Sequence, residues 1–307
     1  MRDQATAVTL PGRSPAGSWR EHTRLFFDLF KLRIGFAIGL TAFAGAMATP
    51  GPGPAGWQVL LLVVCVIAAS AAAGAFNQFM ERDVDARMGR TRGRPFVTGR
   101  LTAGPFWLGV IGLMLALAVG AAALAVNPQA ALFVFLGAFF YGVVYTVLLK
   151  RRTWLNIVVG GLAGSFAVLA GASAVAPGEP APVALAFAWI LFLWTPPHFW
   201  SLAIAFQDDY RAAGIPMLPV VKGDALASRA VFSGTLLLVA SSLLPLAFGM
   251  GPIYAAGAIA GGALFVRAAA RLRASPSRES AMASFHASLA QLTLLLVAAI
   301  ADAAWRG

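Results

Sequence analysis

The chain has 307 residues, of which 59% are hydrophobic and only 11% are charged, and its mean hydropathy is +0.78. This composition excludes a soluble globular protein and indicates a chain that crosses a membrane several times. The formal net charge of +11 is typical of nucleic-acid-binding proteins, but also of membrane proteins whose basic residues gather on one side, so the positions of these residues must decide.

The first two dozen residues are polar and lack the short apolar core and small-residue cleavage site of a signal peptide. We expect residues 1–24 to form a flexible, cytoplasmic tail and residues 25–307 to form a single membrane-embedded domain. The single cysteine, Cys65, lies inside an apolar run, which excludes an internal disulfide and a cysteine-built metal centre.

Nine apolar segments are expected to span the membrane. They run approximately over residues 34–48, 57–76, 106–126, 130–149, 157–176, 183–206, 231–249, 253–270 and 287–304. The first is short unless residues 25–33 continue it as an interfacial helix, with Lys31 and Arg33 reaching for lipid headgroups. The expected fold is an all-α bundle of about nine transmembrane helices.

The connections between these segments alternate in charge. Residues 49–56, 127–129, 177–182 and 249–252 contain no Lys or Arg, whereas the other connections and the N-terminal region hold all of the 23 basic residues except Arg306. The positive-inside rule therefore predicts a cytoplasmic N-terminus, an outside C-terminus and cytoplasmic basic loops. The lipid bilayer explains the charge, and no nucleic-acid partner is needed.

The second apolar segment is followed by Asn77–Pro95, which is rich in acids and arginines. On a helix, Asn77, Glu81 and Asp85 are spaced i, i+4 and i+8, so their side chains point the same way. Magnesium commonly takes one or two carboxylates and completes its shell with water and substrate phosphates, and arginine binds diphosphate in bidentate fashion. The segment predicts a metal–diphosphate site; the alternative is a solvated loop whose acids balance its bases.

The sixth apolar segment contains Pro196 and Pro197, which are expected to break its hydrogen-bond ladder and bend it. His198 follows directly. A histidine at membrane depth is a functional candidate. The alternative is a ring tied to a carbonyl of a neighbouring helix.

Asp208 and Asp209 follow this sixth segment at about the distance at which Glu81 and Asp85 follow the second. This similarity suggests an internal pseudo-repeat. Two acidic loops that face one another would hold metal ions better than one loop.

Tyr141–Gly164 lies between the two acidic loops and contains the basic triplet Lys150, Arg151 and Arg152. Two interpretations are open. The triplet only fixes the orientation of the loop on the cytoplasmic side, or it also binds diphosphate oxygens next to Tyr141 and Tyr145. Three closely spaced glycines, Gly160, Gly161 and Gly164, are expected to permit tight helix packing.

These segments resemble the UbiA-type intramembrane prenyltransferases and, within that family, the branch that modifies haem. The resemblance rests on Asn77–Pro95, Tyr145–Gly164, Trp194–Phe199 and Asp209–Gly223. It implies a UbiA-like fold in a bacterial-type cytoplasmic (inner) membrane. It also implies transfer of a farnesyl group from farnesyl diphosphate to a vinyl group of haem B, with addition of water, to give haem O for terminal oxidase assembly. Haem B would be a substrate, Mg²⁺ the cofactor, and haem A synthase a downstream partner.

The resemblance also implies roles for particular residues. Catalysis and metal binding fall to Asn77, Glu81, Asp85, Asp208 and Asp209; diphosphate binding to Arg90, Arg92, Arg94, Lys150 and Arg151; haem binding to His198; and the lining of a prenyl chamber to Tyr141, Tyr145, Phe199 and Trp200. Glu81 stands where the family usually has aspartate, and its additional methylene group lengthens the reach of the carboxylate.

Three other interpretations fit parts of the sequence. A UbiA-type enzyme acting on an aromatic quinone precursor shares the expected fold, although Pro196-Pro197-His198 and the run Met217–Val221 argue against it. A secondary transporter has a similar number of spans, but it concentrates charge near the bilayer midplane, whereas almost every acid here lies at the cytoplasmic edge. A non-catalytic haem-binding subunit would not need the acidic and arginine-rich segments.

Overall fold

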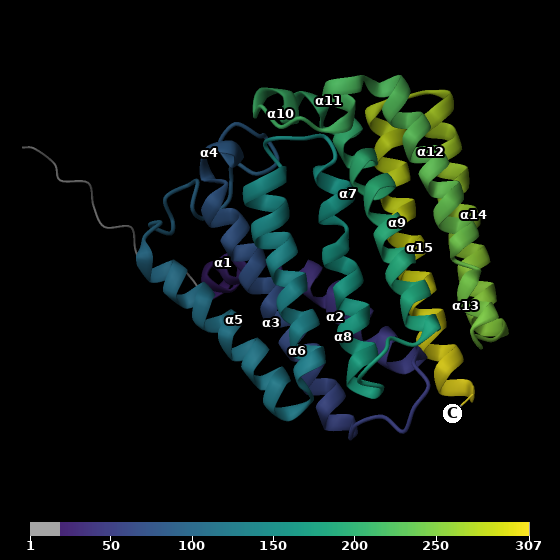
Figure 1. Cartoon of the computed structure of the whole chain (residues 1–307). Coiled ribbons are helices and arrows are strands. Elements are labelled where there is room, and N and C mark those ends of the chain that lie inside the picture. Colours follow the sequence, from purple (N-terminus) through teal and green to yellow (C-terminus); the bar gives the residue numbers. More distant parts are fainter. Residues whose placement is uncertain (1–18, 307) are drawn as a thin grey trace, which may run out of the picture.

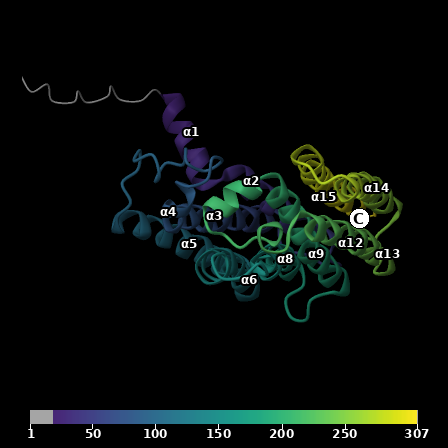
Figure 2. The ribbon, with the colours of Figure 1, turned by 90° about the horizontal axis from the view of Figure 1, so that it is seen from above.

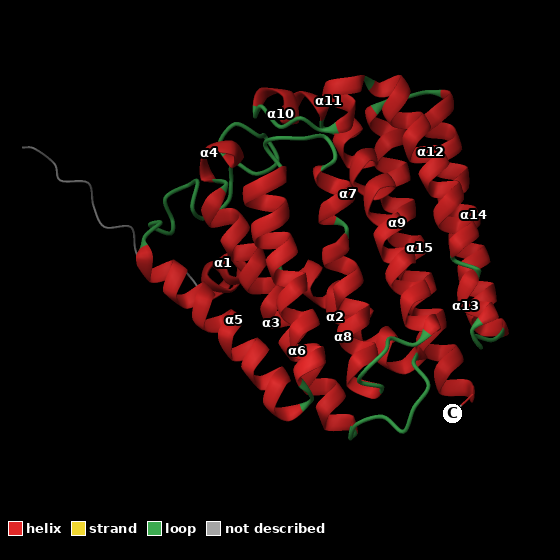
Figure 3. Cartoon of the chain, in the orientation of Figure 1, coloured by secondary structure: helices red, strands yellow, loops and turns green. Residues whose placement is uncertain are grey.

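The computed structural model describes residues 19–306, which contain helices and loops and no strand (Figure 3). The elements are α1 Trp19–Phe30, α2 Leu32–Ala48, α3 Gly56–Met80, α4 Arg82–Asp85, α5 Pro105–Ala125, α6 Pro128–Phe139, the π-helix η1 Phe140–Leu149, α7 Asn156–Gly160, α8 Leu162–Val175, α9 Pro182–Ala205, α10 Gln207–Ala212, α11 Leu218–Lys222, α12 Asp224–Ser241, α13 Leu244–Ala247, α14 Pro252–Ala274 and α15 Arg278–Arg306. Within residues 19–306, eight helical stretches are long and apolar enough to span a membrane, or nine when a bent pair is counted as one span. The predicted all-α membrane bundle is confirmed.

The bent pair is α1 and α2, which meet at 53°. Lys31 lies at the bend with φ 48° and ψ 42°, a left-handed conformation that only this non-glycine residue adopts among those described. Helix α1 begins at Trp19, so residues 19–24 of the expected tail are helical, and residues 1–18 lie outside the described part of the chain. The bend turns α1 away from α2 and leaves Lys31 at the corner.

The long helices pack side by side in one curved layer that closes on α2 (Figures 1 and 2). Helices α3, α5, α6 and α8 form one side, α9, α12, α14 and α15 form the other, and α2 contacts α3, α8 and α15 between them. Helix α2 packs so closely on α8 that a Cβ atom at Gly171 would overlap the carbonyl oxygen of Ala42. The short helices α4, α10 and α11 lie together at one end of the bundle, opposite the C-terminus (Figure 1).

The starts of several spans have ordinary helix-capping chemistry. Helices α5, α6, α9 and α14 carry proline in their first turn, where the missing N–H has no intrahelical partner to lose. The Asn127 side chain accepts a hydrogen bond from the Ala130 N–H at the start of α6. Asp302, near the end of α15, accepts bonds from the backbone N–H groups of Gly251, Ile253 and Tyr254, and thereby fixes α14 to the last helix.

Helix α9 continues through Pro196 and Pro197 as one helix. Since proline has no backbone N–H, the hydrogen-bond ladder of this helix lacks two donors there, and two hydroxyl groups bond to nearby carbonyls of the same helix. The Ser201 hydroxyl donates to the Pro197 carbonyl at 2.7 Å, and the Thr195 hydroxyl donates to Leu191 O at 3.0 Å. Gly234 of α12 leaves room beside the Pro197 ring.

Candidate active site

The candidate site lies at the end of the bundle where α3 gives way to α4. Helix α3 ends at Met80, and Glu81 connects it to α4 with φ −102° and ψ 17°. The expected single helix is therefore interrupted, yet Asn77, Glu81 and Asp85 are all buried, with 1–2% of their surface exposed. An amide and two carboxylates are thus withdrawn from solvent within a short stretch of chain.

Each of these buried acceptors faces a cation from another part of the chain. Lys31 Nζ donates to Asn77 Oδ1 at 2.6 Å, and Lys150 Nζ lies 2.6 Å from Glu81 Oε2. The Arg94 guanidinium binds the Asp85 carboxylate. Buried charges are tolerated when they are paired, so Lys150 and Arg94 account for the burial of the Glu81 and Asp85 carboxylates.

The π-helix η1 supplies the opposite wall. The Lys150 N–H bonds to Tyr145 O at 2.9 Å, five residues back, and Thr146 Oγ1 accepts a 3.1 Å bond from Asn77 Nδ2. Tyr141 OH accepts a 3.0 Å bond from Lys31 Nζ. The Tyr141 and Tyr145 rings stack at 5.9 Å. The absence of a side chain at Gly160 lets α7 pack closely against the Tyr145 ring, because a Cβ there would lie 2.9 Å from that ring.

The second acidic loop contacts the first. The backbone N–H of Arg90 donates to Asp209 Oδ2 at 3.3 Å. Asp208 is highly exposed and pairs with Arg211 at 2.6 Å. Both aspartates line a pocket of about 610 Å³, together with Gly89, Arg90, residues 204–207 and Arg278. The prediction that the two acidic exits face one another agrees with this contact.

The other predicted diphosphate-binding residues are more peripheral. Arg151 makes two hydrogen bonds to Asp83, at 2.7 and 2.8 Å, and both side chains are about half exposed. The Arg151 hydrogen bonds hold the pKa of Asp83 below its usual value, and Asp83 raises the pKa of Arg151 in return. Arg92 is exposed. The structure therefore brings Arg94 and Lys150 to the buried acceptors and leaves Arg151 bound to Asp83 outside them.

His198 is buried between α9 and α15. Its Nδ1 lies 2.6 Å from Ser288 Oγ, and its ring stacks on Trp194 at 4.1 Å and on Phe285 at 4.5 Å. The neighbouring helix therefore holds the ring through a hydroxyl group rather than through the carbonyl considered above.

The four predicted chamber aromatics pack in three different clusters, with Tyr141 against a cluster that includes residues of α3 and α6. Phe199 and Tyr145 both pack against a cluster that includes Val84, Met88 and Ile157, close to the acidic segment. Trp200 belongs to a different cluster, with residues of α11, α12, α14 and α15. Phe199 and Tyr145 therefore share a cluster, and Trp200 belongs to another.

The oxygen donors suit a hard divalent cation. Glu81 Oε1 is buried and has no hydrogen-bond partner within residues 19–306. In the same part of the chain, no three His, Cys, Asp or Glu side chains are grouped closely enough to hold a metal ion on their own. Mg²⁺ is commonly held by one or two carboxylates and by substrate phosphates. These residues fit an ion that arrives with a diphosphate.

The profile of the UbiA prenyltransferase family matches residues 38–294. The chain belongs to the UbiA prenyltransferase family. Two curated relatives, both from Paramagnetospirillum magneticum, are similar over nearly their whole length. Protoheme IX farnesyltransferase 2 is 55% identical over 91% of this chain and 96% of its own. Protoheme IX farnesyltransferase 1 is 45% identical over 92% of this chain and 99% of its own. This UbiA prenyltransferase is thus an enzyme that transfers a prenyl group.

Solved structures agree on the fold. A digeranylgeranylglyceryl phosphate synthase has a TM-score of 0.74 at 18% identity, over 92% of this chain and 99% of its own. A UbiA homolog from Aeropyrum pernix K1 has a TM-score of 0.70 at 21% identity, over 88% and 98%. A UbiA homolog from Archaeoglobus fulgidus bound to GPP and Mg²⁺ has a TM-score of 0.65 at 16% identity, over 90% and 99%. The UbiA-like fold is confirmed.

Two candidate residues of this UbiA prenyltransferase escaped the sequence analysis. Lys31 was expected to reach lipid headgroups, but its amine lies against Asn77 and Tyr141 instead. Arg278, at the start of α15, lines the pocket of Asp208 and Asp209, and its guanidinium lies 5.3 Å from the Phe206 ring. The sequence could have indicated Lys31, because a lysine beside or within an apolar span is a functional candidate. Arg278 is distant in sequence from the other site residues and had no such signal.

Proposed function

We propose that this prenyltransferase transfers the farnesyl group of farnesyl diphosphate to a vinyl group of haem B, and that water completes the product, haem O. The full-length similarity to protoheme IX farnesyltransferases supports this choice of substrates. One observation supports the proposed diphosphate site: the buried Glu81 and Asp85 carboxylates are each paired with a cation, Lys150 and Arg94.

The proposed metal ligands are Asn77, Glu81, Asp85, Asp208 and Asp209. Mg²⁺ bound there would neutralise charge that develops on the departing diphosphate. Lys150 and Arg94 now neutralise the carboxylates themselves. Between turnovers, the two ion pairs would keep the acids charged and buried. With a metal diphosphate in the site, the same two cations would bind diphosphate oxygens instead.

The C–O bond between the farnesyl group and diphosphate breaks, and diphosphate leaves with the electron pair. The terminal vinyl carbon bonds to the farnesyl carbon, which leaves a positive charge on the vinyl carbon beside the porphyrin. Water adds to that carbon and loses a proton, so the products are haem O and protonated diphosphate.

Aromatic rings and the exclusion of water would protect the allylic cation. Tyr141, Tyr145 and Phe199 are the side chains we propose for this chamber, because ring faces stabilise positive charge and the tyrosines stack beside Lys150. Trp200 packs in a different cluster and is assigned no direct role in the chamber.

We propose that His198 contacts haem. Its ring extends from α9 toward α15, where Nδ1 is hydrogen-bonded to the Ser288 hydroxyl. Only its other nitrogen, Nε2, would then face a ligand. Arg90, Arg92 and Arg151 are proposed to attract diphosphate to the site from the surrounding surface.

The chain is an integral membrane protein, and we propose a bacterial-type inner membrane with the end that bears α4, α10 and α11 in the cytoplasm. The asymmetric distribution of basic residues supports this orientation. The N-terminus would then be cytoplasmic and the C-terminus outside. Haem O would pass to a haem A synthase or directly to an oxidase.

Incubation of detergent-purified protein with haem B, farnesyl diphosphate and Mg²⁺, with and without a chelator, tests the proposal. The expected result is a chelator-sensitive gain in porphyrin mass equal to one farnesyl group plus one hydroxyl group. Farnesyl transfer to an aromatic quinone precursor, with no change in haem, would retain the prenyltransferase and refute the acceptor. Absence of diphosphate release with any acceptor would refute the reaction as a whole.

A further inference from the structure

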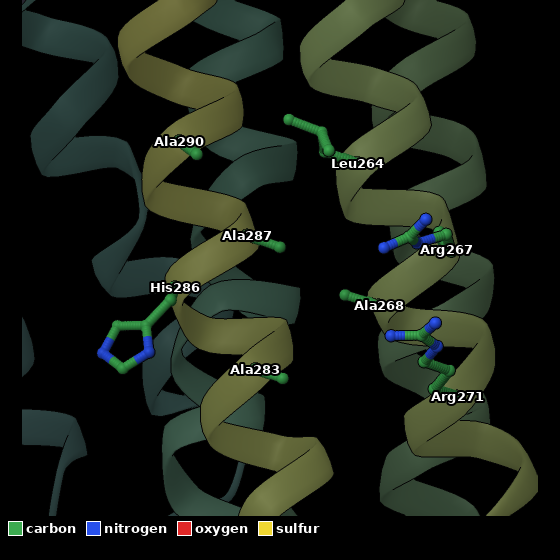
Figure 4. Close-up of a pocket in the computed structure, with 8 residues that line it drawn as sticks. All are labelled: Leu264, Arg267, Ala268, Arg271, Ala283, His286, Ala287 and Ala290. Carbon is green, nitrogen blue, oxygen red and sulfur yellow. The ribbon is translucent and has the colours of Figure 1, made fainter.

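A groove between α14 and α15, at the end of the bundle where α15 begins, takes no part in the reaction proposed above (Figure 4). It encloses about 360 Å³. One wall carries Ala283, Ala287 and Ala290 of α15, whose spacing of four and three residues places them on one helix face. The other wall carries Leu264, Arg267 and Arg271 of α14.

The two arginines are one helical turn apart and lie one above the other along α14 (Figure 4). Both are exposed, and among the side chains that the structure describes no carboxylate lies within 4 Å of either guanidinium. His286 of α15 and Ala268 of α14 also line the groove, and the two arginines are its only Lys or Arg side chains. The groove therefore offers two positive charges that no acid of the described chain neutralises.

Both arginines lie toward the C-terminal end of α14, a helix that is long and apolar enough to span a membrane. Helix α14 ends at Ala274, so a rise of about 1.5 Å per residue puts Arg271 about 5 Å and Arg267 about 10 Å before that end. A charged side chain at such a depth is costly unless it reaches the interface or meets an opposite charge. Arg267, the deeper of the two, has the stronger need for an anion.

The polarity of the groove changes along its length in the same order as that of a phospholipid. Arg271 and Ala283 lie at the end nearest the membrane surface, and Leu264 and Ala290 lie at the deepest end (Figure 4). We infer that the groove binds one anionic phospholipid, whose phosphate lies between Arg267 and Arg271 and whose acyl chain follows the alanine face of α15. Anionic headgroups commonly occupy basic pockets between transmembrane helices.

A titration of the purified full-length chain, followed by native mass spectrometry, tests this site without any enzyme substrate. The probes are dioleoyl phosphatidylglycerol and dioleoyl phosphatidylcholine, which share the phosphate and the acyl chains and differ in net charge. The wild-type protein should bind phosphatidylglycerol at least tenfold more tightly. The double variant Arg267→Gln/Arg271→Gln should lose that preference and leave phosphatidylcholine binding within twofold.

Arg273→Gln is the matched control, because Arg273 belongs to the same helix but stacks on Phe232 at 5.0 Å, away from the groove. It should keep the preference within twofold. Ala287→Phe, which fills the groove and keeps both charges, should weaken binding of both lipids. Arg267→Lys/Arg271→Lys should retain the preference and shows that a variant at these positions folds.

Three results would overturn the inference. Equal affinity of the wild type for the two lipids excludes a site selective for anions. A loss in Arg273→Gln as large as in the double variant shows a general charge effect. A dimer that dissociates only in the double variant identifies the groove as a contact between copies of the chain.

Discussion

Lys150→Met removes the cation that faces the buried Glu81 carboxylate. The two charged atoms are 2.6 Å apart, and the side chains of Lys150 and Glu81 are only 11% and 1% exposed. At an effective dielectric constant of about 20 their attraction is about 6 kcal/mol, much of which is offset by desolvation of both charges. Removal of one partner leaves an unpaired buried carboxylate and costs about 3–5 kcal/mol.

Thermal unfolding in detergent, followed by tryptophan fluorescence, measures this cost. Lys150→Met should melt roughly 10 °C below the wild type and lose about 10²-fold or more in turnover. The double variant Glu81→Gln/Lys150→Met removes both charges, so its melting temperature should recover while its turnover remains low. Arg151→Met, which breaks the exposed pair with Asp83, is the control and should cost at most about 1 kcal/mol.

Two outcomes would refute this reasoning. Equal melting temperatures for Lys150→Met and the wild type would show that the Glu81 carboxylate does not depend on Lys150. Wild-type turnover in the double variant would exclude both residues from the diphosphate site, whatever their effect on stability.

Three further predictions concern single residues. Asp85→Asn should lower turnover about 10²–10³-fold at unchanged membrane content, whereas the same substitution at the exposed Asp83 should stay within about tenfold; parallel rate assays decide. Lys31→Met removes a donor to Asn77 and should raise the KM for farnesyl diphosphate about tenfold more than the KM for haem, as steady-state kinetics will show. His198→Gln should weaken haem binding in an absorbance titration, with Ser288→Ala as the control that keeps the imidazole; unchanged affinity in His198→Gln excludes direct ligation.

The number of spans and the acidic segments could be predicted from the sequence because they depend on local properties. Apolar length determines a span, and Asn77, Glu81 and Asp85 stand out by their spacing, although the structure interrupts the expected helix at Glu81. The contact between the two acidic loops, through Arg90 and Asp209, followed from their similar positions after two spans.

Tyr141 and Lys150 both face α3, and the sequence did not predict that they share this side. At about 100° per residue, nine residues along an α-helix lead to the opposite face. In the π-helix η1 the wider turn brings both to the side of α3, where Lys31 links Tyr141 to Asn77 and Lys150 meets Glu81. Whether a segment widens in this manner depends on the helices packed around it.

By itself, the sequence determined the membrane class of this protein, its helical spans and the positions of two acidic segments, because hydrophobic length and residue spacing are properties of short stretches of chain. Only the tertiary structure decided which cation meets which carboxylate. Lys31 is 46 residues from Asn77 and Lys150 is 69 residues from Glu81, and each pair meets because the bend between α1 and α2 and the packing of η1 on α3 bring distant segments together.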